Sequence, residues 1–167
     1  TYNRERQLER ALKSICNQSY ENLEIIVVNG HPDTDPSGVF PDDVEIKYIQ
    51  HLENHGISRT RNDGIAAATG EFVAFLDDDD EWKPEKIKMQ VQKFQELDPE
   101  YKMVYAGRCV RDGSETTRSF SPSRGGDVYE ELLERNFIAS ETPLVKTKIL
   151  RETGGFDEEL DFGEDWE

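Results

Sequence analysis

Four consecutive aspartates, Asp77 to Asp80, directly follow a mostly apolar run over residues 71–76. Such a run is typical of a buried strand, and the ligands of open α/β sheets bind beyond the carboxyl ends of strands. Because alternate side chains of an extended backbone point the same way, Asp77 and Asp79 are expected to converge on one side. Carboxylate oxygens suit a hard divalent ion, so the cluster predicts a site for Mg²⁺ or Mn²⁺.

The same aspartates have a second interpretation, which the sequence leaves open. A helix is expected to begin near Pro84. Acidic side chains are common at helix N-termini, because they accept hydrogen bonds from free backbone N–H groups and favour the positive end of the helix dipole. Asp80 is the best placed of the four for such a cap.

Residue patterns around the cluster predict alternating strands and helices. Short runs rich in β-branched residues predict strands over residues 23–28, 44–49, 71–76, 102–110 and 142–146. Apolar residues at helical spacing predict helices over residues 4–19, 57–68, 84–97, 127–135 and 147–153. Residues 29–43 and 111–126 are expected to be loops, the second one mobile. The alternation predicts an α/β fold with a mostly parallel sheet flanked by helices, in a single domain over residues 1–167.

The composition is strongly acidic. Lys and Arg total 20 whereas Asp and Glu total 36, which gives a net charge of -16 at pH 7. A field of this sign repels nucleic-acid phosphates and anionic membrane surfaces, so neither is expected as a partner of the bulk surface. It repels a nucleoside diphosphate as well, and an anionic substrate of this kind therefore needs a local cation.

The two cysteines, Cys16 and Cys109, are too few for a disulfide framework. Cys16 lies next to the apolar stripe of the expected helix over residues 4–19, so a reduced thiol in the core is expected. No apolar run approaches the roughly 18 residues needed to span a bilayer, and no signal peptide is visible.

Motifs along the chain resemble those of the family 2 glycosyltransferases, inverting enzymes of the GT-A fold. They are Thr1-Tyr2-Asn3-Arg4, the stretches over residues 56–64 and 68–77, Gly154-Gly155-Phe156-Asp157 and Gly163-Glu164-Asp165-Trp166. The resemblance covers nearly the whole chain, and the combination is far more specific than any one piece. It implies a catalytic domain truncated at both ends, with a first strand before residue 1 and a further helix after residue 167.

The resemblance implies a donor site built from separated residues: Tyr2, Asn29, Arg61, Asn62, Asp77 and Asp78. Tyr2 matches the tyrosine that packs on the nucleotide base, and the pair Arg61 and Asn62 matches the helix that lines the nucleotide site. Asp77 and Asp79 match the ends of the DxD motif. Asp79 is then the direct ligand of Mg²⁺ or Mn²⁺, and Asp77 faces the ribose or the metal.

On the acceptor side, Asp165 matches the general base, Glu164 is its neighbour in the ED pair, and Trp166 is expected to line the acceptor site. The implied reaction moves a sugar from a nucleoside diphosphate to the hydroxyl of a glycan, a lipid-linked or another acceptor. Cytosolic nucleotide sugars imply a cytoplasmic location, including the cytoplasmic face of a membrane. Membrane association is expected only through segments outside the chain.

One departure from the family pattern bears on the donor. The family usually has a second aspartate after the second strand, which reads the base, but Gly30 stands at that position. Base recognition then falls to Asn29, or to Asp33 or Asp35 from a shifted loop. UDP, GDP and dTDP sugars all remain open as donors.

Two other functions compete with this interpretation. A nucleotidyltransferase that makes sugar nucleotides shares the nucleotide-binding sheet, but it needs a Gly-rich, basic phosphate loop after its first strand. The stretch Tyr2-Asn3-Arg4-Glu5-Arg6 contains no glycine, which counts against that activity. A non-catalytic nucleotide-binding or Ca²⁺-binding module is the second alternative.

Overall fold

The structure, a computed structural model, describes residues 1, 4–113 and 115–160. The first half of the chain forms α1 (Glu5–Cys16), β1 (Ile25–Asn29), the 3-10 helix η1 (Pro36–Val39), β2 (Ile46–Gln50) and α2 (Gly56–Ala67). The second half forms β3 (Phe72–Val73), α3 (Lys86–Glu96), β4 (Met103–Tyr105), β5 (Arg108–Asp112), β6 (Glu115–Phe120), α4 (Tyr129–Glu134), β7 (Pro143–Lys146) and α5 (Thr147–Glu152). The expected α/β class is confirmed. None of the described helices has the length and apolar composition needed to cross a bilayer.

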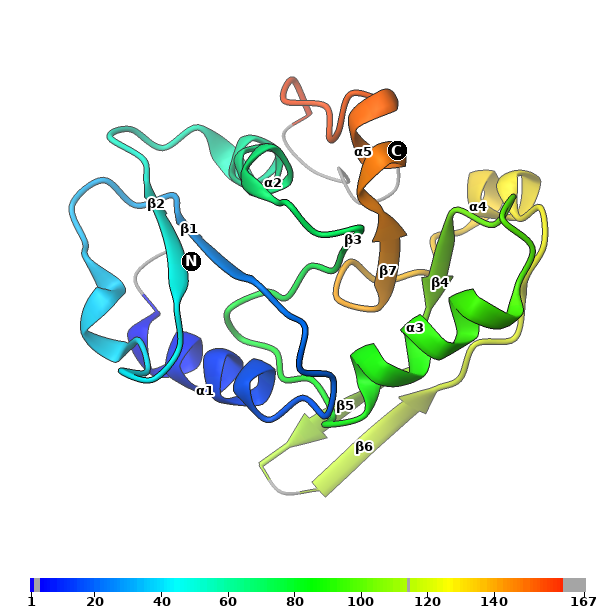
Figure 1. Ribbon diagram of the computed structural model, residues 1–167, viewed down its shortest axis with the longest axis horizontal. Coiled ribbons are helices and arrows are strands. Elements are labelled where there is room, and N and C mark those ends of the chain that lie inside the picture. Colours follow the sequence, from blue (N-terminus) through cyan, green and yellow to red (C-terminus); the bar gives the residue numbers. More distant parts are fainter. Residues whose placement is uncertain (2–3, 114, 161–167) are drawn as a thin grey trace.

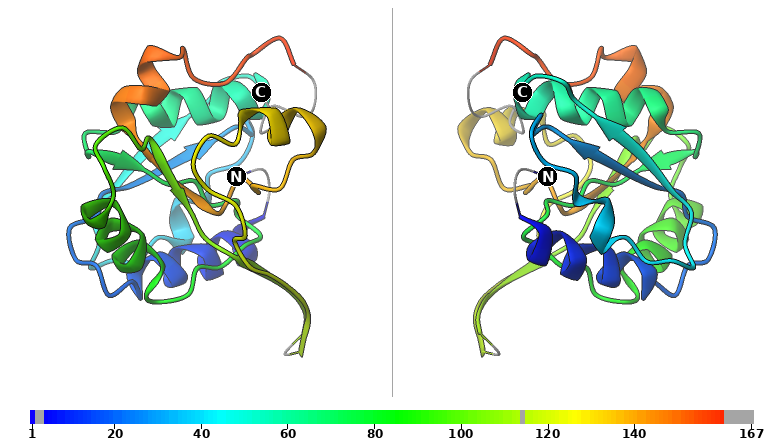
Figure 2. Two further views of the ribbon diagram at one scale, coloured as in Figure 1. Left: turned by 90° about the vertical axis from the view of Figure 1, so that its right-hand side faces the viewer. Right: turned by 90° about the vertical axis from the view of Figure 1, so that its left-hand side faces the viewer.

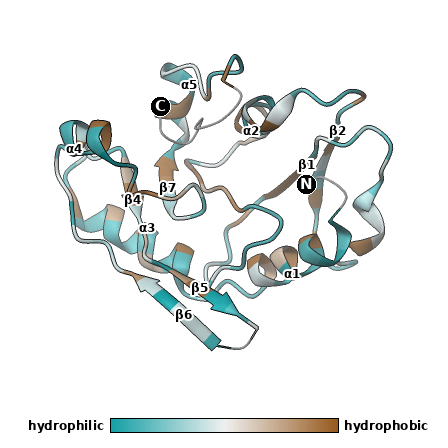
Figure 3. Ribbon diagram, turned by 180° about the vertical axis from the view of Figure 1, so that it is seen from behind, coloured by the Kyte–Doolittle hydropathy of each residue, from teal (hydrophilic) through white to brown (hydrophobic). Residues whose placement is uncertain are grey.

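The helices form two layers around the strands. Helices α1 and α3 lie on one side of the strands, and α2 and α5 lie on the other (Figure 1). This arrangement follows from the sequence, because each helix has one apolar stripe to bury and a charged face for solvent. Apolar colouring is concentrated on inner strands such as β1 and β7, whereas the β5–β6 hairpin is mostly hydrophilic (Figure 3).

The core on the α1 side is made by residues that the helical spacing singles out. Leu8 and Leu12 pack on Ile25 and Val27 of β1, and Leu12 is only 1% exposed. The prediction that Cys16 is a thiol of the core is wrong, because the residue is exposed at the end of α1. The stripe that faces β1 ends before this position.

The strand pairings are less parallel than expected. β1 and β2 pair in parallel, with Ile25 opposite Ile46. β7 lies between β3 and β4 and is antiparallel to both of them. β3 and β4 therefore run in the same direction and are joined through α3, as the alternation of elements indicates. The insertion of β7 between them is a long-range event that no local pattern encodes.

Residues 102–120 depart further from expectation. The expected strand over 102–110 is divided at Gly107 into β4 and β5, and β5 pairs with β6 as an antiparallel hairpin where a loop was expected. A Cβ atom at Gly107 would clash with the carbonyl oxygen of Phe120, so the close approach of the two backbones requires glycine there. All residues of β6 are exposed, and the hairpin projects from the body (Figure 2). A strand that is solvated on both faces shows no apolar alternation, which explains why the sequence did not predict it.

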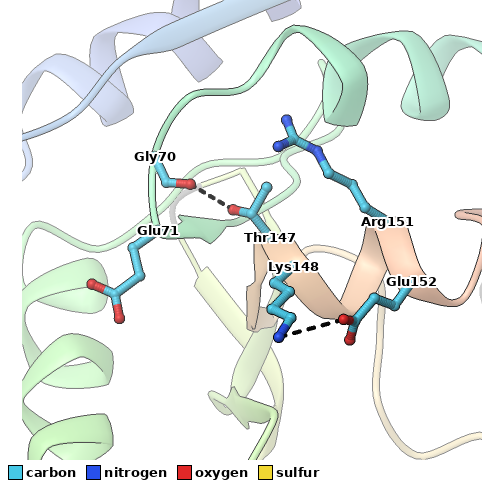
Figure 4. Close-up of a pocket in the computed structure, with 6 residues that line it drawn as sticks. All are labelled: Gly70, Glu71, Thr147, Lys148, Arg151 and Glu152. Atoms are coloured by element: carbon cyan, nitrogen blue, oxygen red, sulfur yellow. Dashed lines mark hydrogen bonds and ion pairs between the residues drawn. The ribbon is translucent and has the colours of Figure 1, made fainter.

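Helix α5 fastens the carboxyl end of α2. The Arg151 guanidinium donates hydrogen bonds to the carbonyl oxygens of Ile65 and Ala68 at 3.0 and 2.7 Å, and Thr147 Oγ1 donates to Gly70 O at 2.7 Å. These bonds satisfy carbonyl groups that a helix end leaves free. A hollow of about 430 Å³ beside them is lined by the residues that Figure 4 draws: Gly70, Glu71, Thr147, Lys148, Arg151 and Glu152. The polar contacts there serve to hold the two helices together.

Candidate functional site

The acidic cluster lies where the sequence places it, after β3. β3 itself is shorter than the expected strand over 71–76, and the chain turns at the aspartates, where the N–H of Asp80 donates to Asp77 O at 3.1 Å. The side chains of Asp77 and Asp79 are 40% and 55% exposed, whereas that of Asp78 is 9% exposed. The side chains of Asp77 and Asp79 are therefore more accessible to solvent than that of Asp78 between them; their convergence on one ion stays a prediction.

A cavity of about 1140 Å³ leads to the cluster. It lies between β1 and residues 68–79, and α1 and α2 contribute to its walls. Its inner lining is apolar and includes Val28, Val73 and Phe75, while Arg4 and Arg61 join the aspartates among its polar lining residues. The backbone of residue 1 lies beside the end of β1, because its amino group donates to Val28 O at 3.0 Å. The aspartates among these lining residues follow the carboxyl end of β3, the position where open α/β sheets bind ligands.

Two arginines hold the exposed carboxylates. Arg4 Nη1 lies 3.1 Å from Asp78 Oδ1 and 2.9 Å from Asp79 Oδ2. Arg61 Nη2 lies 3.3 Å from Asp77 Oδ1, and Ser140 Oγ is 3.4 Å from the other oxygen of the same carboxylate. The cluster is therefore bordered by cations, which are the groups that an anionic diphosphate needs in an acidic protein.

The oxygen ligands at the cluster fit a divalent ion that a substrate completes. Within residues 1, 4–113 and 115–160, no group of three or more His, Cys, Asp and Glu side chains is arranged to hold a metal. Mg²⁺ is usually bound by only one or two protein carboxylates together with waters and substrate phosphates. Asp79 and Asp77 supply two such carboxylates, and Arg4 would have to release Asp79 for an ion to bind.

The alternative role of Asp80 as a helix cap is wrong. α3 begins at Lys86, and its N-cap residue is Glu85, which makes no side-chain capping bond. Asp80 is half-buried behind the cluster, where burial and then the nearby carboxylates of Glu141, Asp79 and Asp77 raise its pKa to about 6. The nearby Arg108 opposes this shift.

Asn29 is fully buried at the end of β1. Its Nδ2 donates to Thr34 O at 2.8 Å and to Gln50 Oε1 at 3.0 Å, and its Oδ1 accepts from the N–H of His31 at 3.1 Å. These contacts hold the loop that follows the strand. Contact of Asn29 with a nucleotide base stays a prediction, as it does for Asp33 and Asp35.

The pair Arg61 and Asn62 on α2 divides its contacts between two places. Arg61 is 8% exposed and its guanidinium carbon lies 5.3 Å from the centre of the Phe156 ring, beside its contact with Asp77. The Asn62 carboxamide donates hydrogen bonds to the carbonyl oxygen of Phe156 and to the carboxylate of Glu158, and it accepts one from the N–H of Phe156. α2 therefore connects the acidic cluster to residues 154–158.

Several predicted residues lie outside the described part of the chain. They are Tyr2, Glu164, Asp165 and Trp166. Sequence reasoning singled out neither Arg4 nor Phe156 as a site residue. Both belong to recognised motifs, but their contacts join segments far apart in the chain, so no local spacing could have identified their roles.

Comparison with known proteins identifies the family. The sequence profile described as Glycosyl transferase family 2 matches residues 1–153. The chain belongs to this family. Family 2 membership and the α/β structure agree with the resemblance that the motifs indicate.

Similar proteins and structures support the assignment. A GalNAc(5)-diNAcBac-PP-undecaprenol beta-1,3-glucosyltransferase of Campylobacter jejuni is 33% identical over 96% of this chain and 53% of its own length. S. aureus TarS in complex with UDP superposes with a TM-score of 0.75 at 24% identity, covering 99% of this chain and 51% of that one. The mannosyltransferase PcManGT from Pyrobaculum calidifontis, in complex with GDP-Man and Mn²⁺, gives a TM-score of 0.68 at 25% identity, covering 96% and 46%.

The two solved structures establish the fold of this chain. Both solved structures are GT-A-type transferases, so the chain has the GT-A fold. The chain spans 53%, 24% and 41% of the length of three curated relatives that it matches. It therefore corresponds to about half or less of each of those proteins.

Proposed function

We propose that the chain provides the donor-binding and catalytic part of an inverting glycosyltransferase, which moves a sugar from a nucleoside diphosphate to an acceptor hydroxyl. The observation that carries this proposal is the pair of partly exposed carboxylates, Asp77 and Asp79, which line the cavity together with Arg4 and Arg61. Family membership supports glycosyl transfer as the reaction class. The complexes of neighbours with UDP and with GDP-Man and Mn²⁺ support a nucleotide-sugar donor and a divalent ion.

In the proposed reaction, the acceptor oxygen attacks the anomeric carbon on the face opposite the diphosphate. The bond from that carbon to the diphosphate oxygen breaks, its electron pair leaves with the nucleotide, and the configuration inverts. The hydroxyl proton passes to the carboxylate of Asp165, a contribution of roughly 10²–10⁴-fold for a general base. Tyr2 is proposed to pack on the base, and Glu164 and Trp166 to face the acceptor.

Negative charge develops on the leaving diphosphate, and the site has to balance it. Arg4 and Arg61 are close enough to the carboxylates to reach a phosphate bound there. A divalent ion held by Asp79 and Asp77 would supply further neutralisation of the leaving group. We also assign Asp78 to this donor side, where its side chain pairs with Arg4.

The acceptor is proposed to be a hydroxyl of a glycan or of a lipid-linked sugar. The name of the Campylobacter relative specifies an undecaprenol-linked acceptor, which supports the lipid-linked class. A lipid-linked acceptor would bring the protein to the face of a membrane without a spanning helix in the described residues.

The test is thermal stabilisation by UDP, GDP and dTDP, each with and without Mn²⁺. A ligand that binds only the folded state stabilises it by about 2.7 kcal/mol at a hundredfold excess over Kd. We expect a metal-dependent shift with one of the nucleotides, which also identifies the donor class. A folded sample that shows no shift with any of them would contradict the proposal and favour a non-catalytic domain.

A further inference from the structure

The side chain of Asn62 has nearly all of its hydrogen-bonding capacity engaged within the protein. Its Nδ2 donates to Phe156 O and to Glu158 Oε1, each at 2.8 Å, and its Oδ1 accepts from the N–H of Phe156 at 2.8 Å. A carboxamide has two N–H donors, and both are engaged here. A nucleotide contact by this side chain would therefore require breaking bonds to the turn.

The turn opposite Asn62 is shaped for this contact. α5 is followed, after Thr153, by two glycines with left-handed backbone, Gly154 at φ 93 and Gly155 at φ 79. A Cβ atom at Gly155 would overlap Asn62 Oδ1. Glycine is needed at Gly155 for two independent reasons, since its positive φ disfavours other residues and the carboxamide fills the space of a side chain.

The same turn touches the acidic cluster through Phe156. The ring of Phe156 packs edge-on against Phe75, with ring centres 5.4 Å apart, and lies under the guanidinium of Arg61 at 5.3 Å. Arg61 in turn contacts Asp77. Adjacent residues of α2 thus connect one turn both to the proposed donor site and to the chain that continues toward Glu164 and Asp165.

We propose that Asn62 is a positioning residue: it clamps residues 154–158 against α2, and so fixes the point from which the chain continues toward the proposed general base Asp165. This inference rests on the proposed function, because it takes Asp165 as the base. A misplacement of about 1 Å at a reacting group can lower a rate by roughly 10²-fold, so a clamp at the root of this segment matters for turnover. The bonds of Asn62 go to Phe156 and Glu158, so we expect its loss to lower turnover more than nucleotide affinity.

The experiment compares Asn62→Ala with the natural protein in three measurements. These are the Kd of the nucleotide that stabilises the natural protein with Mn²⁺, kcat for hydrolysis of the corresponding nucleotide sugar, and hydrogen–deuterium exchange over residues 154–160. We expect Kd to change by no more than about twofold, kcat to fall by about 10- to 100-fold, and exchange over residues 154–160 to become faster.

Two further variants keep the test informative. Gly155→Ala pushes a methyl group into the carboxamide of Asn62 and should reproduce the fall in kcat at unchanged Kd, even where Asn62→Ala is too unstable to measure. Arg59→Gln is the matched control on the same helix: it removes the ion pairs of Arg59 with Glu158 at 3.5 Å and with Asp63 at 3.1 Å but leaves the bonds of Asn62 to Phe156 intact. Its kcat should stay within about twofold, as expected for an exposed ion pair.

The outcomes separate this inference from the proposed function. A tenfold or greater rise in Kd for Asn62→Ala, with unchanged exchange over residues 154–160, would show that Asn62 is a nucleotide ligand and overturn the inference. Unchanged kcat in both Asn62→Ala and Gly155→Ala would overturn it as well. If the natural protein binds none of the three nucleotides, the proposed function fails, and faster exchange in Asn62→Ala would still show the clamp without a role in catalysis.

Discussion

Arg4 Nη1 lies 2.9 Å from Asp79 Oδ2, although the two residues are 75 positions apart in the chain. The same nitrogen lies 3.1 Å from Asp78 Oδ1. The carboxylate proposed to bind the metal is therefore already paired with a cation of the protein. Arg4 and the proposed divalent ion would therefore compete for Asp79, and release of Arg4 would leave its guanidinium beside the place proposed for the diphosphate.

Arg4→Gln should strengthen the binding of Mn²⁺ to the nucleotide-free protein. Loss of an exposed ion pair is worth up to about 1 kcal/mol, so a gain of up to about fivefold in affinity is expected. Titration calorimetry with Mn²⁺ measures it. Arg10→Gln is the matched control, because it removes the same charge from α1 and breaks the pair with Glu81 at 2.6 Å. Equal effects of the two variants would mean that net charge, and not competition at Asp79, governs binding.

Asp79→Asn should abolish the metal-dependent part of nucleotide binding, because the ion loses a charged ligand. The thermal shift with the active nucleotide plus Mn²⁺ should fall to the shift without Mn²⁺. The exposed Asp98 provides a control, since Asp98→Asn makes the same chemical change away from the cluster. A full Mn²⁺-dependent shift in Asp79→Asn would remove Asp79 from the metal site.

Asp165→Asn tests the role of the proposed general base on the acceptor side. The variant should bind the nucleotide with Mn²⁺ as the natural protein does, because the residue is assigned to the acceptor side. Its rate of sugar transfer should fall by about 10²–10⁴-fold, the usual contribution of a general base. Transfer at a near-normal rate would show that another group accepts the proton.

The stability of the protein should depend on pH through Asp80. Its pKa is raised from 3.8 to about 6, mainly by burial, so the folded state holds this proton to a higher pH than the unfolded chain does. The free energy of unfolding therefore falls as pH rises from about 4 to about 6, and ionised Asp80 destabilises the fold above that range.

Asp80→Asn removes this dependence. The melting temperature of the variant should exceed that of the natural protein above pH 6, and the difference should disappear toward pH 4. Thermal melts from pH 4 to 7 measure it, with Asp98→Asn as the matched exposed control. A difference that stays constant over this range would contradict the assignment of the shift to Asp80.

Leu12→Ala should destabilise the core between α1 and β1. Leu12 is 1% exposed and packs with Leu8, Ile25 and Val27, so truncation leaves a cavity and costs about 2–5 kcal/mol. Denaturant unfolding measures the loss. Leu52 is 87% exposed, and Leu52→Ala should change the free energy of unfolding by less than about 0.5 kcal/mol. Similar losses at both positions would contradict the packing described for α1.

Local sequence patterns predicted most of the fold correctly. Helices α1, α2 and α3 lie within or close to the ranges expected from apolar spacing, and β1 and β2 lie within two residues of theirs. These elements each bury one face against a neighbour, and burial of one face is what produces a readable period. The β5–β6 hairpin has no buried face, and it was expected to be a loop for that reason.

In the acidic cluster, too, local sequence predicts some features and not others. The place of Asp77, Asp78 and Asp79 shortly after a strand was predictable, because it depends on neighbouring residues of the sequence, whereas the turn that the chain makes at these residues was not expected. The position of Asp80 was not predictable in the same way. Its pKa depends on its burial and on the charges of residues such as Glu141 and Arg108, which approach from a distant part of the chain.

The sequence by itself determined the order of the strands and helices outside the β5–β6 hairpin, the family 2 motifs and the place of an acidic cluster after a strand. Each of these depends on residues close together in the chain. Only the tertiary structure decided that Arg4 pairs with Asp79, 75 positions away, and that Asn62 binds the backbone of Phe156, 94 positions away. Such contacts arise when separate elements pack their apolar faces together. The polar groups that meet at the edges of these packed faces leave no periodic pattern in the sequence.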